Sequence, residues 1–139
     1  MDKEQKILTA ATKLFAEEGV SVPTSRIAKA AGVSNGTLFN YFETKQALID
    51  SLYYSVKSGL VETLFNEKNE EIDTEDFHSM LKNTWHFFVN WALENPYEFA
   101  VIGLLYNARL ISDEVLESSD KLFEFFRNRL VQHVFIALT

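Results

Sequence analysis

Cysteine is absent from the 139-residue chain, and helix breakers are scarce, with two prolines and five glycines. The lack of cysteine excludes a disulfide framework, thiolate-bound zinc, iron–sulfur clusters and a cysteine nucleophile. Because strand-like alternation is also missing, the sequence predicts an all-α fold. No apolar run approaches the ~18 residues of a membrane span. The first residues are charged, so we expect no signal peptide, no membrane contact and a cytoplasmic location.

Histidine is also rare, and its three copies (His78, His86 and His133) form neither a metal-spaced pair nor a catalytic-triad order. The chain has no glycine-rich loop of the kind that cradles phosphates. The sequence therefore predicts no catalytic residue, no metal site and no cofactor. We expect a protein that is not an enzyme.

Charge is unevenly distributed. The net charge of −7 argues against a protein that simply coats nucleic acid. Residues 1–48 nevertheless carry six basic and five acidic side chains, whereas the remainder carries seven basic and fifteen acidic ones. An acidic body with a near-neutral head fits a protein that presents only its head to a polyanion.

The head has the pattern of a helix-turn-helix. Residues 3–18 predict an amphipathic helix that ends at Gly19. Thr24 is the expected N-cap of a second helix that runs through Ala31, and Ser34 is the expected N-cap of a third. Two short helices joined by a glycine-containing turn form a helix-turn-helix.

The third helix is expected to direct Leu38 and Phe42 inward and to present a face without any charge. Short amides can read base edges, hydroxyls can bond phosphate, and rings can touch a thymine methyl group. The alternative is that the two aromatic rings pack on the first helix while the amide and the glycine only shape the turn. The outward residues are Asn35, Gly36, Thr37, Phe39, Asn40 and Tyr41.

Lys45 favours the first interpretation. Thr44 is the expected N-cap of a fourth helix, which makes Lys45 its first residue. A cation at this end opposes the helix dipole by about 0.3–1 kcal/mol. A bound phosphate would be held by both the ammonium and the helix amides, which removes the conflict. The alternative is an ordinary surface lysine.

The run from Thr24 to Leu48 resembles the DNA-binding signature of TetR-family transcriptional repressors through its segments IA..AGVS, GTLF.YF and TK..L. The resemblance implies that Thr24, Tyr41 and Lys45 bind phosphate. Phe39 stands where the family usually has tyrosine, and Arg26 borders the site, where it contacts either phosphate or solvent. The whole implied DNA-binding set is Thr24, Ser25, Arg26, Ser34, Asn35, Gly36, Thr37, Phe39, Asn40, Tyr41 and Lys45.

The resemblance also implies a division into a DNA-binding domain, residues 1–47, and a helical ligand-binding and dimerisation domain, residues 48–139. After the helix-turn-helix, helices are expected over 45–65, 74–93 and 96–111, and further ones from Ser112 and Ser119. The 74–93 helix is apolar on two faces, so we expect it at the centre of the body. Family members usually continue with two more long helices. The chain is therefore expected to be truncated or short, with its dimer contacts after Ser112.

A small-molecule pocket is implied by the same resemblance. Its candidate residues are Trp85, Phe88, Asn90, Trp91, Phe99, Tyr106, Asn107 and Arg109. The competing interpretation is that the rings are ordinary core residues. Arg109 either neutralises an acidic ligand or pairs with Asp113 in solvent.

The expected function is that of a homodimeric repressor of transcription, released from a roughly palindromic double-stranded DNA operator by a small apolar or aromatic effector. The alternative is a helical interaction module whose helix-turn-helix binds protein. That alternative predicts no salt-dependent affinity for DNA.

Overall fold

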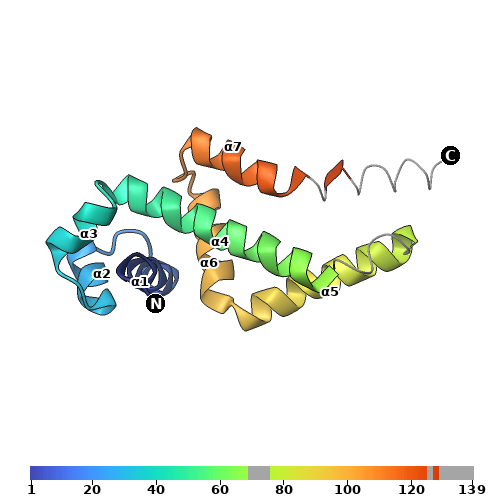
Figure 1. Ribbon diagram of the computed structural model, residues 1–139, viewed down its shortest axis with the longest axis horizontal. Coiled ribbons are helices and arrows are strands. Elements are labelled where there is room, and N and C mark those ends of the chain that lie inside the picture. The colour runs from blue at the N-terminus through green and yellow to red at the C-terminus, as the bar shows by residue number, and fades with distance from the viewer. Residues whose placement is uncertain (69–75, 125–126, 129–139) are drawn as a thin grey trace.

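The computed structural model describes residues 1–68, 76–124 and 127–128, and these fold into helices without any strand (Figure 1). The predicted all-α fold is therefore confirmed. The helices are α1 (Lys3–Glu18), α2 (Thr24–Ala31), α3 (Asn35–Tyr41), α4 (Lys45–Lys68), α5 (Phe77–Glu94), α6 (Pro96–Asn107) and α7 (Asp113–Leu122). None of the described helices is both long and apolar enough to cross a membrane.

Helices α1, α2 and α3 form a head at one end of an elongated molecule (Figure 1). Two glycines shape it as predicted, because Gly19 ends α1 at a φ of 90° and Gly32 ends α2 in the left-handed region at a φ of 73°. The Ser34 hydroxyl accepts a hydrogen bond from the Thr37 amide at 3.1 Å and so caps α3. The helix-turn-helix thus follows from local caps.

One cap prediction is wrong by a residue. Thr24 is the first residue of α2, and Pro23 occupies the N-cap position in an extended conformation. Proline has a fixed φ and no N–H to lose, so it fits a helix entrance without any side-chain cap.

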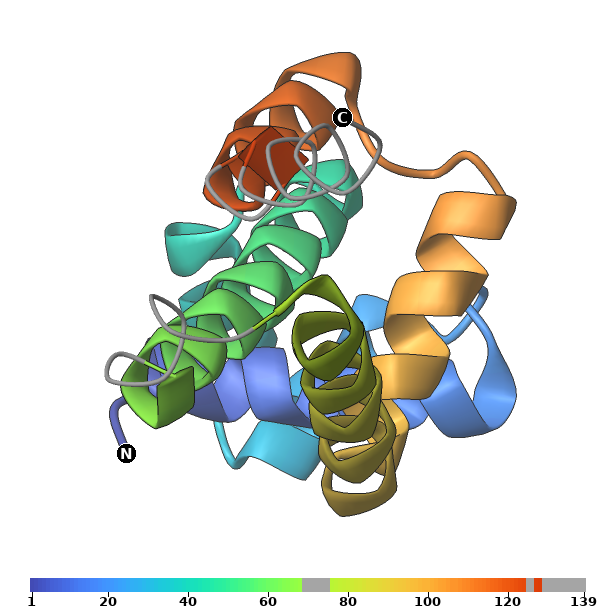
Figure 2. The same cartoon turned by 90° about the vertical axis from the view of Figure 1, so that its right-hand side faces the viewer.

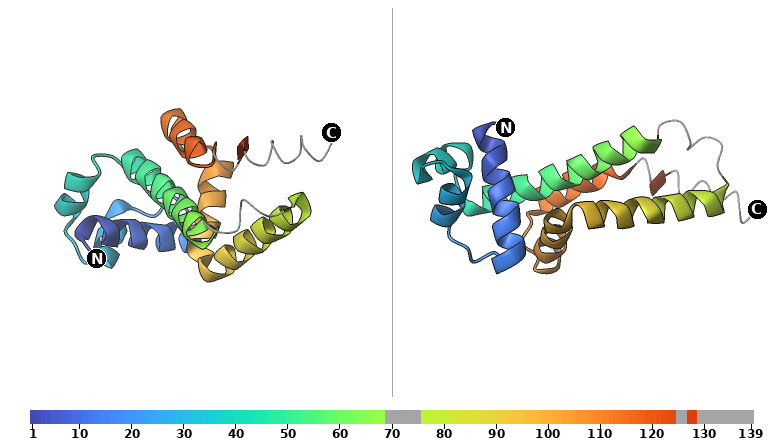
Figure 3. Two further views of the ribbon diagram at one scale, coloured as in Figure 1. Left: turned by 45° about the vertical axis from the view of Figure 1, so that its right-hand side comes forward. Right: turned by 90° about the horizontal axis from the view of Figure 1, so that it is seen from below.

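One apolar core joins the head to the body. Phe15, Ile27 and Leu38 of the head are buried in the same cluster as Leu52 of α4 and Leu105 of α6. Figure 3 shows α1 between the α2–α3 pair and α6. The expected domain boundary after residue 47 falls inside α4, a continuous helix.

The turn between α6 and α7 is fastened to the first turns of α4. The side-chain amide of Gln46 donates to the Leu110 carbonyl at 2.8 Å, and the Asp50 carboxylate accepts from the backbone N–H of Ser112 at 3.0 Å. From there α7 runs along α4 (Figures 1 and 2). These two hydrogen bonds connect the start of α4 with the segment between α6 and α7.

Helix boundaries in the body differ from those expected. Helix α6 ends at Asn107, before Ile111, because Arg109 adopts a left-handed φ of 56°. Ser119 is not a cap: it lies buried within α7, and its hydroxyl donates to the Leu116 carbonyl at 2.9 Å. Helix α5 begins at Phe77 after the N-cap Asp76. The expected helix start at Thr74 and most of the last helix, expected from Ser119, lie outside the described residues.

The prediction that α5 is central is wrong within the described chain. Its buried face carries Phe87 and Trp91, which pack with Leu60 and Leu64 of α4. Its opposite face is open to solvent, with Trp85 71% exposed. Two-sided apolarity requires a second neighbour, and no described helix covers that face.

Candidate nucleic-acid interface

The predicted face of α3 is solvent-accessible. Phe39 is 40% exposed and Tyr41 47% exposed, so neither ring is buried against α1. Asn35 and Asn40 are exposed as well, while Leu38 and Phe42 point into the core. The head therefore holds amides, a phenol and a phenyl ring at its surface without any charged group between Asn35 and Tyr41.

The start of α3 is arranged by short polar side chains. The hydroxyl oxygens of Ser34 and Thr37 lie 2.9 Å apart. A Cβ added to Gly36 would meet only the Ser34 hydroxyl, at 3.9 Å. Packing among the described residues therefore does not require glycine at this position.

Lys45 lies where the sequence predicts, at the first position of α4, and the Thr44 hydroxyl caps that helix by accepting from the Ala47 amide at 3.0 Å. Its ammonium donates to the Val22 carbonyl at 2.9 Å and lies 5.9 Å from the centre of the Phe15 ring. Sequence spacing did not reveal these contacts. An ammonium has three donors, so two remain for a phosphate.

Helix α2 contributes its first turn, where Thr24 is half-buried and Ser25 is exposed. Arg26 does not simply face solvent. Its guanidinium makes two hydrogen bonds to the Glu18 carboxylate, at 2.9 and 2.8 Å. These hydrogen bonds lower the pKa of Glu18 and raise the pKa of Arg26. The pair is exposed and joins the end of α1 to α2 beside the implied DNA contacts.

Replacing Glu18 by glutamine is expected to strengthen DNA binding. The substitution removes a negative charge and releases the Arg26 guanidinium for phosphate, which should raise the affinity for any duplex by about threefold at low salt. Glu17→Gln is the matched control, because it removes the same charge from a neighbouring exposed residue without releasing Arg26. Equal gains in the two variants, measured by fluorescence anisotropy, would show that Arg26 is not a DNA ligand.

The body candidates are distributed over separate cavities. Phe88, Trp91, Phe99 and Asn107 line one cavity of about 490 Å³, which we call the apolar cavity. It lies between α4, α5 and α6, and its described lining also includes Lys57, a residue that the sequence did not suggest. A concave and mostly apolar site between several helices is typical of small-molecule sites.

The other candidates lie elsewhere. Asn90, together with Trp91, lines a more polar cavity of about 510 Å³ that reaches α1. Tyr106, Asn107 and Arg109 line a third, of about 490 Å³, beside the start of α7. Within the described residues Arg109 makes no ion pair with Asp113. The same part of the chain holds no group of three or more potential metal-binding side chains.

The N-terminal part of the chain is similar to known proteins. The sequence profile described as "Bacterial regulatory proteins, tetR family" matches residues 7–52. An uncharacterized HTH-type transcriptional regulator of Haemophilus influenzae is 32% identical over 97 residues, which cover 68% of this chain and 50% of that protein. The nucleoid occlusion factor SlmA of Actinobacillus pleuropneumoniae is 30% identical over 97 residues, covering 68% and 46%.

A crystal structure assigned to the TetR family of transcription regulators, from Shewanella sp. PV-4, superposes with a TM-score of 0.84 at 26% identity. The match covers 95% of this chain and 70% of that one. The chain spans about half the length of the curated relatives that it matches.

Proposed function

Since this chain belongs to the TetR family of bacterial regulatory proteins through its N-terminal helix-turn-helix, we propose that it acts as a homodimeric repressor of transcription. In this proposal it binds a roughly palindromic DNA operator and leaves it when a small effector occupies the body. The observation that carries the proposal is the exposed and uncharged face of α3 at the end of the head. We assign it a regulatory rather than an enzymatic role, in the cytoplasm where the operator lies.

On DNA, α3 enters the major groove. Asn35, Asn40 and Thr37 are placed to meet base edges, because amides and hydroxyls match the donor and acceptor pattern there. Phosphates are contacted by the hydroxyls of Thr24 and Tyr41 and by the ammonium of Lys45. A dimer would place two copies of α3 about 34–36 Å apart, one helical turn of DNA.

Release by an effector follows from the connection between body and head. A ligand in the apolar cavity contacts α4, α5 and α6, and α4 begins directly after the helix-turn-helix. The bonds from Gln46 and Asp50 to the α6–α7 turn make these helices move together. Coupling of about 1–3 kcal/mol would change operator occupancy severalfold or more.

The experiment that tests the proposal is selection of binding sites by the purified protein, followed by variants in the head. Tyr41→Phe removes only an exposed hydroxyl and is expected to weaken binding to all DNA sequences by about tenfold. Lys45→Ala should have the same uniform effect, whereas Asn40→Ala should change the preferred sequence. The assigned interface is wrong if the selected operator binds all three variants as tightly as the parent protein.

Salt dependence separates DNA recognition from the protein-interaction alternative. Each neutralised phosphate releases counterions, so the affinity of a DNA-binding head falls steeply with salt concentration. Affinity for DNA that is absent, or that does not change between about 50 and 200 mM salt, would favour a protein partner for α3.

A further inference from the structure

Lys57 is a half-buried cation in an apolar part of the body. It lies in the middle of α4, and its ammonium is 5.4 Å from the centre of the Tyr53 ring and 5.1 Å from that of Phe123. Burial lowers the pKa of Lys57, and the charge of Asp120 partly opposes this shift. A charge in such surroundings is stabilised by a counter-ion.

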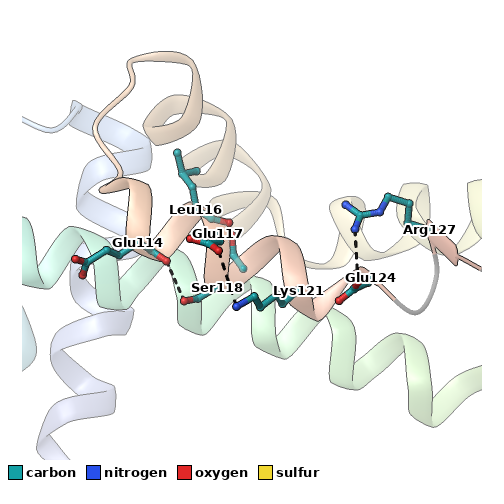
Figure 4. A network of polar contacts seen from close by, with 8 residues as sticks. Glu114, Leu116, Glu117, Ser118, Lys121, Glu124 and Arg127 are labelled. Atoms are coloured by element: carbon teal, nitrogen blue, oxygen red, sulfur yellow. Dashed lines mark hydrogen bonds and ion pairs between the residues drawn. The ribbon is translucent and has the colours of Figure 1, made fainter.

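The described part of the chain does not supply that counter-ion within ion-pair distance of Lys57. In α7 and the residues after it, two ion pairs join other side chains (Figure 4). Glu117 lies 4.0 Å from Lys121, and Glu124 lies 4.0 Å from Arg127. Two aromatic rings lie within about 6 Å of the Lys57 ammonium, and rings balance a cation only in part.

Lys57 also lines the apolar cavity, where it is the sole charged residue in the described lining. Phe88, Trp91 and Phe99 supply rings, and Leu60 supplies an aliphatic wall. Asn107 adds one amide that can donate a hydrogen bond. The described lining of the cavity thus combines apolar side chains with one cationic residue and one neutral donor.

We propose that the apolar cavity binds a monocarboxylic acid with an apolar body, and that Lys57 is the residue that selects the acid by pairing with its carboxylate. One ammonium balances one carboxylate, whereas a phosphate ester would bring charge that the cavity leaves uncompensated. The inference rests on the proposed effector role of this cavity and names the chemical class of the effector. Neutralising an acidic ligand is one of the two alternative roles expected of Arg109, and we assign it to Lys57 in this proposal, because Arg109 lines a different cavity.

Binding of octanoate and of 1-octanol to the full chain tests this directly, since the two probes differ only in their head group. Trp85 and Trp91 are the two tryptophans, so a Trp85→Phe background leaves the emission of Trp91, in the cavity wall, as the signal. Octanoate is expected to bind more tightly than octanol. Lys57→Met should weaken the affinity for octanoate by about tenfold or more and change the affinity for octanol by no more than about twofold.

Two further variants serve as controls. Lys57→Arg keeps the charge and should keep most of the preference for the acid. Lys82→Met removes an exposed lysine from α5 and should leave the affinity for both probes unchanged. Failure of octanoate to bind, or equal weakening of both probes by Lys57→Met, would overturn the proposal and make Lys57 a packing residue. The binding assay with the two probes contains no DNA, so this proposal and the proposed operator binding can be overturned independently of each other.

Discussion

Replacing Gly36 by glutamate is expected to reduce operator affinity by about a hundredfold or more while leaving the free protein at least as stable as the parent. A side chain at this position meets nothing of the protein closer than the Ser34 hydroxyl, at 3.9 Å from the Cβ. A residue other than glycine also improves helix propensity by up to about 1 kcal/mol. Glutamate in the first turn of α3 is further favoured by the helix dipole.

Gly36→Glu is expected to weaken DNA binding, although it does not destabilise the free protein, because the added charge faces the DNA. Gly36 lies between Asn35 and Thr37 on the face of α3 that is proposed to contact DNA, so a carboxylate there would approach the polyanion at contact distance. Like charges brought together at an interface cost several kcal/mol, and 1.4 kcal/mol is a factor of ten. This combination of a more stable protein and weaker binding distinguishes a docking surface from a structural turn.

Gly36→Ala and Ser118→Glu complete the comparison. Alanine adds only a methyl group, so it should stabilise the head and weaken binding by a smaller factor. Ser118→Glu adds the same charge to the exposed surface of α7, and operator affinity should change little. Anisotropy titrations and thermal melts of the three variants give both quantities. If Gly36→Glu binds operator like the parent, α3 does not enter the groove.

Much of the head could be predicted because its signals are local. Gly19, Gly32 and Ser34 determine where helices end and begin through their own backbone or hydroxyl, so each can be read without knowing the tertiary contacts. Thr24 was misplaced by one position because proline and threonine both favour helix entrances, and here Pro23 takes the N-cap position.

Contacts between distant segments could not be predicted in the same way. The partner of Lys45 is a carbonyl 23 residues earlier, and the partner of Arg26 lies on another helix. The partial burial of Lys57 could not be predicted, because a lysine in an amphipathic helix is taken to be solvated until its neighbours are known. The exposure of Trp85 could not be predicted for the converse reason: an aromatic residue in the sequence does not reveal that its side of α5 has no described neighbour.

Phe15→Ala is the substitution expected to cost most stability. Its ring is completely buried, at 0% exposure, and it packs where α1 meets α2 and α4. Truncating a buried phenylalanine costs about 3–5 kcal/mol, a large share of the ~5–15 kcal/mol that stabilises a typical domain. Phe99→Ala is the matched control: the same atoms are removed from a ring that is 60% exposed, and the expected loss is below about 1 kcal/mol.

Whether Phe15→Ala destabilises the body as well as the head tests whether the chain unfolds as one unit or as two. The core that contains Phe15 also contains Val101, Leu105 and Ile111, which belong to α6 and the turn after it. Loss of this ring should therefore lower the unfolding midpoint of the body together with that of the head. Far-UV circular dichroism reports all helices, and tryptophan emission reports only α5, where both indoles lie. Coincident transitions in Phe15→Ala would show one cooperative unit. An unchanged tryptophan transition beside a lowered helical one would instead show that residues 1–47 unfold separately, despite the shared core.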